Sequence, residues 1–374
     1  MINLFNEEIT DIDFKNPFLT TQLITYIGNK RALLPFLNYG FEKIKTKLNK
    51  QKISVFDGFA GSGVVSRLLK EHCNILYAND LEHYSYICNK CFLSNRSEIS
   101  PQQINSTIDY LNTQKTSLID GFITKNYAPK NDYFIQPYER AFYTHKNAMI
   151  LDTFKKWIFE NIPARDQHFY LAPLIVQASI HTNTSGVFKG FHKKNGIGHF
   201  GGKGENALKR ILGEITLEYP LFSFKECEVN VFQENTNALI KTLPEVDVAY
   251  YDPPYNQHPY GSNYFMLNII AREQLSFSIQ NGVSGITTDW NRSDYNKRQA
   301  AITAMDDLIK NTNSKYIMLS YNNEGIIPFA TLKKLLEKYG NVELLKQKYN
   351  TYRGCRNLNN RSTKVDEYLW ILKR

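Results

Sequence analysis

Residues 53–80 contain the pattern that most constrains how this chain folds. A β-prone run, Ile53–Asp57, ends in a carboxylate and is followed by a glycine-rich turn, a short helical segment and a second β-prone run that ends at Asp80. Strand, glycine turn, helix, strand and acid is the beginning of a doubly wound α/β sheet. Gly61 and Gly63 let the backbone approach a ligand, and Asp80 is placed to hold ribose hydroxyls. We expect a nucleoside site at this sheet edge; a turn without a ligand is the alternative.

The rest of the chain predicts one α/β domain built from both ends of the sequence. Residues 96–221 are mostly helical in pattern and contain no clear strand–helix–strand unit. We therefore expect a sheet domain formed by residues 1–95 and 222–374, with a mostly helical insertion at 96–221. A helix is expected over 29–48. Further β-prone runs lie at 227–232, 246–252, 316–320, 342–349 and 367–372.

The most specific motif is Asp252-Pro253-Pro254-Tyr255, which follows a buried β-prone run. Two successive prolines at a strand end make a rigid loop. Such a loop suits chemistry at an aromatic amino group, whose lone pair is delocalised into the ring. If the Asp252 carboxylate and the Pro253 carbonyl accept its two N–H groups, the nitrogen moves towards sp³ and its lone pair can attack an electrophilic methyl group. Tyr255 offers a flat face for an extruded base. An ordinary turn is the alternative.

The composition indicates a globular protein with a polyanionic partner. The net charge is +9 and the pI is about 9.0. The five cysteines are an odd number and give no disulfide framework, and we interpret Cys88 and Cys91 as small apolar residues on one helix face. The N-terminus lacks a signal-peptide pattern, and no apolar run approaches the roughly 20 residues that span a bilayer. We expect a cytoplasmic protein with no membrane contact.

Together these motifs resemble the DNA adenine-N6 methyltransferases of the DNA adenine methylase family, in which the cofactor motif precedes the target-recognition region and D-P-P-Y follows it. The resemblance covers most of the chain. It implies a class I S-adenosylmethionine-dependent methyltransferase fold, which is a Rossmann-like, mixed seven-stranded sheet with a mostly helical target-recognition insertion. The catalytic residues that it implies are Asp252, Pro253 and Tyr255, and no metal is expected. The cofactor-binding residues that it implies are Tyr26, Lys30, Asp57, Phe59, Gly61, Gly63, Asp80, Asn235, Thr236 and Asp252.

Five segments are candidates for contact with DNA. Residues 140–152 and 182–188 resemble the part of the family that meets DNA, and 256–265 resembles its mobile loop beside the target base. A basic, glycine-rich stretch lies within 192–203, and a basic and aromatic loop lies within 349–364. A solvated loop is the alternative for both basic segments. The candidate DNA-binding residues are Lys193, Lys194, His199, Lys203, Tyr260, Asn263, Tyr264, Tyr352, Arg353, Arg356 and Arg361.

The function that these motifs predict is methylation of adenine N6 in double-stranded DNA, with S-adenosylmethionine as the donor and the target base flipped out. We expect a monomeric, site-specific modification enzyme with a cognate restriction endonuclease as its partner. N4-cytosine methylation uses the same chemistry, although those enzymes more often begin the motif with Ser than with Asp252. An RNA adenine methyltransferase and a catalytically silent DNA-binding relative are further alternatives. A dehydrogenase is disfavoured because Ser66 stands where its third glycine would fall.

Overall fold

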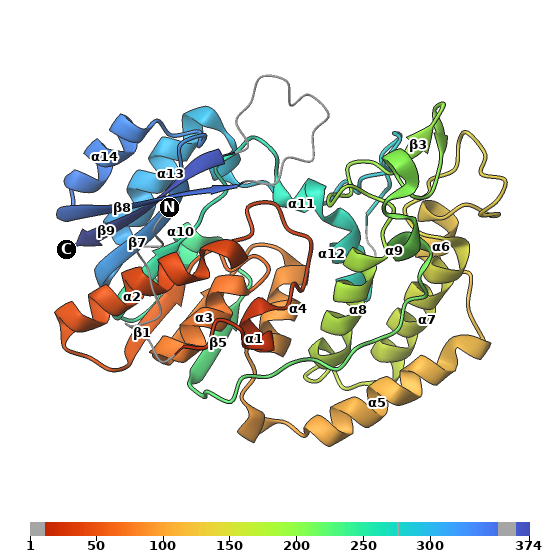
Figure 1. Ribbon diagram of the computed structural model, residues 1–374, viewed down its shortest axis with the longest axis horizontal. Coiled ribbons are helices and arrows are strands. Elements are labelled where there is room, and N and C mark those ends of the chain that lie inside the picture. Colours follow the sequence, from red (N-terminus) through yellow and green to blue (C-terminus); the bar gives the residue numbers. More distant parts are fainter. Residues whose placement is uncertain (1–11, 275–276, 351–363) are drawn as a thin grey trace.

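The structure is a computed structural model that describes residues 12–274, 277–350 and 364–374 (Figure 1). Its strands are β1 (Ile53–Asp57), β2 (Cys73–Asn79), β3 (Lys193–Lys194), β4 (Ile197–Gly198), β5 (Glu228–Phe232), β6 (Val246–Tyr251), β7 (Ser314–Asn322), β8 (Asn341–Asn350) and β9 (Lys364–Lys373). Its α-helices are α1 (Pro17–Thr20), α2 (Leu34–Leu48), α3 (Val64–His72), α4 (His83–Phe92), α5 (Pro101–Thr113), α6 (Phe122–Tyr127), α7 (His145–Asn161), α8 (His168–Ile180), α9 (Leu208–Leu212), α10 (Thr236–Leu239), α11 (Tyr260–Asn263), α12 (Phe265–Ala271), α13 (Arg298–Asn311) and α14 (Phe329–Glu337).

Seven strands form one sheet in the order β5-β2-β1-β6-β7-β9-β8. The first five in this order are parallel, and β9 runs antiparallel to both of its neighbours, β7 and β8. The chain moves outward from β1 to β2 and β5, and then returns to place β6 on the other side of β1. The strand order therefore reverses between β1 and β6, which is where open α/β sheets bind ligands. This topology confirms the predicted mixed seven-stranded sheet.

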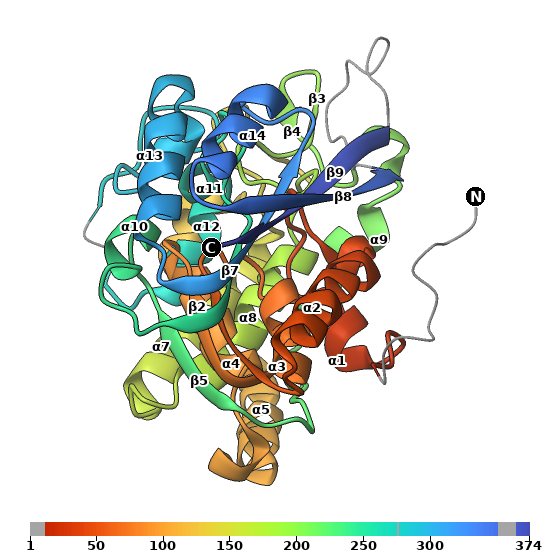
Figure 2. The ribbon, with the colours of Figure 1, turned by 90° about the vertical axis from the view of Figure 1, so that its left-hand side faces the viewer.

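Helices cover both faces of the sheet. Figure 2 shows α1, α2 and α3 on one side and α10, α13 and α14 on the other, and each group shares a hydrophobic core with the strands. The central strand β6 is buried at every residue, as expected for a parallel strand covered on both faces. Its side chains are therefore largely inaccessible to a ligand. Residues that could contact a ligand at this point of the sheet lie in the loop that follows Tyr251.

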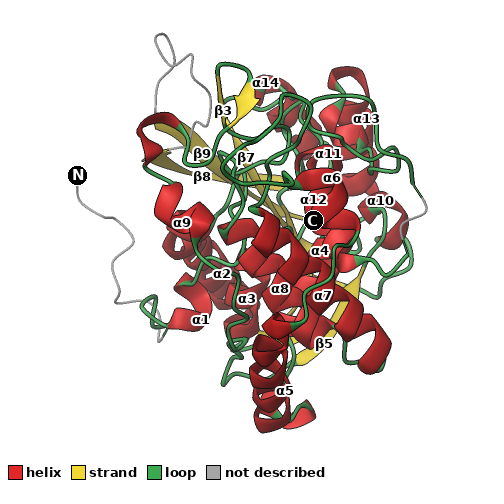
Figure 3. Ribbon diagram, turned by 90° about the vertical axis from the view of Figure 1, so that its right-hand side faces the viewer, coloured by secondary structure: helices red, strands yellow, loops and turns green. Residues whose placement is uncertain are grey.

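A helical body stands beside the sheet and has a core of its own, to which none of the described strands contributes (Figure 3). The body contains α5 to α8, but α4 and α12, which lie outside residues 96–221, also contribute buried side chains to this core. The apolar run over 169–180 forms the buried helix α8, as its composition predicts. The division of the chain at residues 95 and 221 stays a prediction. Of the helices described, none is long and apolar enough to cross a membrane.

The region after Thr25 differs from the predicted helix over 29–48. A 3-10 turn covers Arg31–Leu33, and the α-helix α2 begins at Leu34. Pro35 explains the late start, because a helix that began at Asn29 would need an N–H at Pro35 to continue its hydrogen bonds. Residues 25–30 are consequently free to run as a loop along the edge of the sheet, and this loop lines the cavity described next.

Candidate active site

A cavity of about 610 Å³ opens at the carboxyl ends of β1, β2 and β6, next to the point where the strand order reverses. This volume is within the usual range for small-molecule and cofactor sites. Its walls come from the loop 26–30, the glycine loop after β1, the ends of β2 and β6, and segments around 235–237 and 291–307. The predicted cofactor-binding residues that line it are Tyr26, Lys30, Phe59, Gly61, Asp80, Asn235, Thr236 and Asp252.

Asp57 and Gly63 lie behind the cavity and shape the glycine loop. Asp57 is fully buried, and its Oδ2 accepts a hydrogen bond of 2.6 Å from the Ser66 hydroxyl in the first turn of α3. Gly63 precedes α3 with a φ of 77°, and a Cβ there would lie 2.8 Å from the Asn89 side chain. Both residues thus hold the loop in place without lining the cavity, and their part in cofactor binding stays a prediction.

Asp80 is the carboxylate that the cavity offers to a polyhydroxyl ligand. Its Oδ2 accepts the Gly61 N–H at 2.7 Å and its Oδ1 accepts the Glu82 N–H at 2.8 Å. Each carboxylate oxygen has further acceptor capacity, so both remain able to accept hydroxyl protons. Burial raises the pKa of Asp80 to about 6, against the backbone N–H groups that lower it. Asp80 is therefore ionised at neutral pH and fits the role of a ribose-binding acid.

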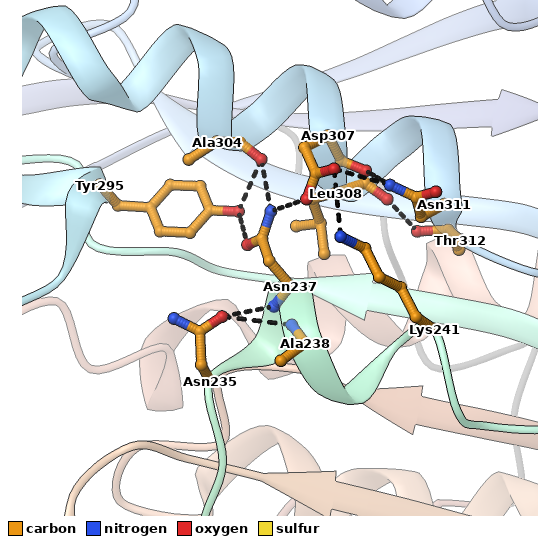
Figure 4. Close-up of polar contacts among 10 residues, drawn as sticks. All are labelled: Asn235, Asn237, Ala238, Lys241, Tyr295, Ala304, Asp307, Leu308, Asn311 and Thr312. Carbon is orange, nitrogen blue, oxygen red and sulfur yellow. Dashed lines mark hydrogen bonds and ion pairs between the residues drawn. The ribbon is translucent and has the colours of Figure 1, made fainter.

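The far end of the cavity is built around Asn237, which the sequence analysis missed (Figure 4). Asn237 Nδ2 donates to Ala304 O at 2.8 Å and to Asp307 Oδ2 at 2.9 Å, and its Oδ1 accepts the Tyr295 hydroxyl at 2.8 Å. The Tyr295 ring meets the Phe59 ring edge-on, with centroids 5.2 Å apart. This network fixes an aromatic corner suited to a flat heterocycle. Tyr295 belongs to no motif. An aromatic residue within a polar stretch is the one signal in the sequence that could have indicated its place in a site.

Asn235 and Thr236 lie at the start of α10, beside the aromatic corner of Phe59 and Tyr295. Asn235 Oδ1 accepts the backbone N–H groups of Asn237 and Ala238 and so caps the helix (Figure 4). The Thr236 hydroxyl donates to Gly58 O at 2.7 Å, which ties α10 to the glycine loop. Asn235 lines the cavity, and within the described residues its amide N–H groups donate no hydrogen bond, whereas Thr236 is buried.

A stack of three tyrosines closes the cavity opposite the sheet. The rings of Tyr26, Tyr260 and Tyr264 pack against one another, with the Tyr26 centroid 4.9 Å from each of the other two and those two 5.9 Å apart. The Tyr264 hydroxyl accepts the Ile27 N–H and the Tyr260 hydroxyl donates to Ile27 O, both at 2.8 Å. Tyr264 and the neighbouring Asn263 are buried, so both have packing positions, and neither lies exposed as a DNA contact would.

Lys30 is the centre of a buried ionic group that joins three distant parts of the chain. Its Nζ lies 3.0 Å from Asp252 Oδ1 and 2.9 Å from Glu367 Oε1. Lys30 is 2% exposed and Glu367 is fully buried, while Asp252 keeps 17% exposure towards the cavity. Burial alone would lower the pKa of Lys30, but Asp252 and Glu367 outweigh it and hold that pKa well above its usual value. Lys30 is therefore a permanent cation behind the Asp252 carboxylate.

Of the three predicted catalytic residues in the loop after β6, Asp252 lines the cavity, whereas Pro253 and Tyr255 are not among the residues that line it. Pro253 is buried, and within the described residues its carbonyl accepts no hydrogen bond. The Tyr255 ring packs edge-on against Tyr321, and its centroid lies 5.2 Å from Lys30 Nζ. Gly28 has a φ of 75°, and a Cβ there would lie 3.0 Å from the Tyr255 hydroxyl. The loop 25–30 therefore lies directly on the tyrosine of the motif.

Comparison with known proteins identifies the family. The profile of the D12 class N6 adenine-specific DNA methyltransferases matches residues 26–335. The chain belongs to this family. Over 94% of its length it is 28% identical to the type II methyltransferase M.NlaIII of Neisseria lactamica, covering 99% of that protein. It is 30% identical to M.CviAII of Paramecium bursaria Chlorella virus 1, covering 93% of this chain and 98% of the relative. Identity to the modification methylase StsI of Streptococcus sanguinis is also 30%, but the chain spans only 52% of that protein.

The family match confirms the predicted class of enzyme, an adenine-specific DNA methyltransferase, together with its fold. It also favours adenine over cytosine as the base. The roles of individual residues rest on the geometry described above and are taken up as proposals. Among the predicted DNA contacts, Tyr352, Arg353, Arg356 and Arg361 lie outside the described residues.

The predicted basic segment of the methyltransferase forms a projecting hairpin, β3–β4, at one end of the helical body (Figure 3). Lys193 and Lys194 are exposed on β3, and His199 follows β4 with partial exposure. Lys203 lies in the 3-10 turn Lys203–Glu205 beyond the hairpin. The hairpin thus presents cations to solvent in a rigid frame, as a phosphate-contacting element would.

The family-like segments 140–152 and 182–188 have mainly structural contacts. Asp152 accepts the N–H groups of Ile123 and Thr124 at 2.9 and 2.8 Å, so it holds the first turn of α6. Asn183 Nδ2 donates to Ala141 O at 2.8 Å and to His199 O at 3.1 Å. Asn183 thus supports the residue that follows β4, whereas Asp152 supports α6, and both side chains are buried.

An exposed aromatic loop beside the hairpin was missed by the sequence analysis. In this loop, residues 129–140, Tyr133, Phe134 and Tyr138 are 93%, 73% and 81% exposed. Glu139 holds the loop by accepting the backbone N–H groups of Lys130 and Gln136, at 3.0 and 2.8 Å. Large apolar side chains held out in solvent indicate an interaction surface.

We predict that kcat/KM for DNA, measured at saturating cofactor, falls as the pH drops through about 6. Burial raises the pKa of Asp252 to about 6, with Glu367 adding to this and Lys30 opposing it. The ionised carboxylate is the form that accepts an amino proton, so activity should be present above this pKa and lost below it. A pH–rate profile from pH 5 to 8 measures the effect. A flat profile over this range would contradict the assignment of Asp252.

Proposed function

We propose that this chain transfers a methyl group from S-adenosylmethionine to N6 of an adenine that is flipped out of double-stranded DNA. The observation that carries the proposal is the Asp252 carboxylate, which lines the cavity with the buried Lys30 cation behind it. Pro253, whose carbonyl accepts no hydrogen bond within the described residues, follows it directly, and the Tyr255 ring centroid lies 5.2 Å from Lys30 Nζ. Two acceptors and a stacking face are the groups that an adenine amino group requires.

The cavity supports S-adenosylmethionine as the methyl donor. Asp80 is a hydroxyl acceptor for the ribose, and the corner of Phe59, Tyr295 and Asn237 suits the adenine ring. At Gly61, whose φ is 53°, a Cβ would lie 3.0 Å from the Tyr26 ring, so the loop is shaped for close approach. When bound, this donor supplies an electrophilic methyl group on a sulfonium. Its position between Asp80 and Asp252 would direct that group towards the Asp252 corner.

The residues of the corner would prepare the amino nitrogen. Asp252 accepts one N–H and the Pro253 carbonyl accepts the other, which draws the nitrogen towards sp³ and frees its lone pair for in-line attack on the methyl group. Positive charge then develops on N6 next to two carboxylates and one ammonium, whose net charge of −1 stabilises it. The nitrogen loses a proton readily once it is cationic, so the reaction requires no separate base.

DNA would lie along the side of the molecule where the cavity opens and the β3–β4 hairpin projects. The exposed lysines Lys193 and Lys194 suit phosphates, and Tyr133 and Phe134 of the aromatic loop suit unstacked bases or sugar faces. The hairpin and the aromatic loop are in direct contact, because Gly198 of the hairpin packs against Ile135 of the loop. We propose that the two form one recognition unit.

The relatives' names support a biological setting for this activity. M.NlaIII and M.CviAII are type II methyltransferases. We propose by analogy that this enzyme protects DNA within a restriction–modification system and that a cognate restriction endonuclease cuts the same sequence. We also propose that the enzyme acts as a monomer. A DNA-modifying enzyme of this kind would act in the cytoplasm.

The direct test is methyl transfer from tritiated S-adenosylmethionine to unmethylated DNA, followed by nucleoside analysis. We expect the label in N6-methyladenine, at one short recurring sequence. Label in N4-methylcytosine would overturn the base assignment. Cofactor binding without label in DNA, together with label in RNA or in no nucleic acid, would contradict the proposed substrate or the activity itself.

If the aromatic loop contacts DNA, removal of its aromatic rings should weaken DNA binding. Tyr133→Ala and Phe134→Ala should each raise KM for DNA about tenfold and leave kcat and cofactor affinity unchanged, because an aromatic contact to a base contributes about 1–3 kcal/mol. Phe224→Ala is the matched control, since Phe224 is 82% exposed but stands before β5, away from the hairpin. Steady-state kinetics on a cognate duplex measures both parameters. Equal KM values for all three variants and the wild type would remove the loop from the DNA surface.

A further inference from the structure

Glu367 is a buried carboxylate that no motif predicts. It lies on β9, between β7 and β8 in the sheet, and its side chain has no exposed surface. A buried carboxylate is costly unless it is paired and hydrogen-bonded. Its Oε1 lies 2.9 Å from Lys30 Nζ and accepts the Ser320 hydroxyl of β7 at 2.5 Å. The carboxylate is thus fixed from the neighbouring strand and aimed at one cation.

That cation is shared with the acidic residue of the motif. Lys30 Nζ is 3.0 Å from Asp252 Oδ1, and it lies over the Tyr255 ring at 5.2 Å from the centroid. The two carboxylates therefore approach the same ammonium from different sides. Of the three groups, Asp252 alone has a side chain that reaches the cavity surface with appreciable exposure.

Because Lys30 is shared between Asp252 and Glu367, it does not neutralise Asp252 fully. An isolated pair of Lys30 and Asp252 would be neutral, and its ammonium would compete with a substrate amino group for the carboxylate. With Glu367 present, the attraction of the ammonium is divided between two carboxylates and the group keeps a net charge of −1. The remaining negative charge is nearest to the cavity at Asp252, where the methylated nitrogen would become cationic.

We propose that Glu367 is a positioning residue for methyl transfer: it holds the Lys30 ammonium in the corner of the motif and leaves Asp252 the negative charge that the adenine amino group needs. This proposal rests on the proposed function above. It assigns a role to the last strand of the sheet, which carries none of the recognised motif residues.

Other groups around Asp252 bear on its titration. Asp57 on β1 adds negative charge nearby, and Asp252 in turn helps to raise the pKa of Asp57. Burial raises the pKa of each neighbouring tyrosine, so these hydroxyls stay neutral at working pH. The described titratable groups that interact with Asp252 or Glu367 are Lys30, Asp57, Tyr250, Tyr255 and Tyr260, and Tyr349 in turn interacts with Tyr255. Of this set, Lys30 is charged near neutral pH and Asp57, whose pKa burial raises to about 7, is partly charged, whereas the tyrosines are neutral.

The test is Glu367→Gln, which keeps the shape and an oxygen for Ser320 but removes the charge. We expect kcat at pH 7.5 to fall about 10- to 100-fold, less than the roughly 100- to 1,000-fold for loss of a direct contact to a transition state, because Glu367 acts through Lys30. The cofactor Kd should be unchanged. Because Glu367 raises the pKa of Asp252, the acid limb of kcat/KM for DNA should move to lower pH. The deficit of the variant should therefore shrink as the pH falls.

Glu343→Gln is the matched control. Glu343 stands on the adjacent strand β8 and pairs with Lys43 and Lys47 of α2 at the surface, so the same substitution there should leave kcat and the acid limb unchanged. A purely structural role for Glu367 predicts a lower melting temperature and an acid limb that stays in place, and this result would overturn the proposal. So would wild-type kcat in Glu367→Gln.

Ser320→Ala tests the same contact if Glu367→Gln does not fold. Loss of the 2.5 Å hydrogen bond should loosen the Glu367 carboxylate and lower kcat several-fold, with the acid limb in place because the charge remains. Unchanged kcat would count against the proposal. Failure of the proposed function is a separate result, since it would appear as absence of N6-methyladenine with the wild-type enzyme.

Discussion

The contact on which the site depends is the buried ionic group of Lys30, Asp252 and Glu367. Its members come from the loop before α2, from the end of β6 and from β9, so the group can form only when the whole sheet is assembled. Desolvating three charged groups is expensive, and removal of one partner from a buried ion pair typically costs about 3–5 kcal/mol. Such a group is a weak source of stability, and its value is that it fixes where the Asp252 carboxylate points.

A second constraint ties the helical body to this corner. α4 and α12 contribute to the core of the body, yet α4 follows β2 and α12 follows the motif loop, so both are attached to the sheet edge. The tyrosine stack of Tyr26, Tyr260 and Tyr264 joins the same two regions across the cavity. Movement of the recognition unit on DNA would therefore be transmitted to the loop that contains Asp252.

The sequence predicts the parts of the site that are local in the chain. The glycine loop, Asp80 and the Asp252–Tyr255 motif can each be recognised from a few consecutive residues. The structure brings Gly61, Asp80 and Asp252 to one cavity. Glu367, Asn237 and Tyr295 carry no local signal, because their positions arise from strand order and from helix packing. For Tyr264 the prediction was wrong in the other direction. Its polar, aromatic segment predicts an exposed DNA contact, but packing against Tyr26 buries its ring. Pro35 was the overlooked signal that shortens the predicted helix.

The most direct test is a structure of the protein bound to S-adenosylhomocysteine and a duplex that contains the recognised sequence. The account predicts an adenine outside the helix with N6 within hydrogen-bonding distance of Asp252 and of the Pro253 carbonyl. It also predicts its ring against Tyr255, and Lys30 still between Asp252 and Glu367. A target base whose amino group is held by other residues, or a Lys30 that leaves Asp252 to bind DNA, would contradict it.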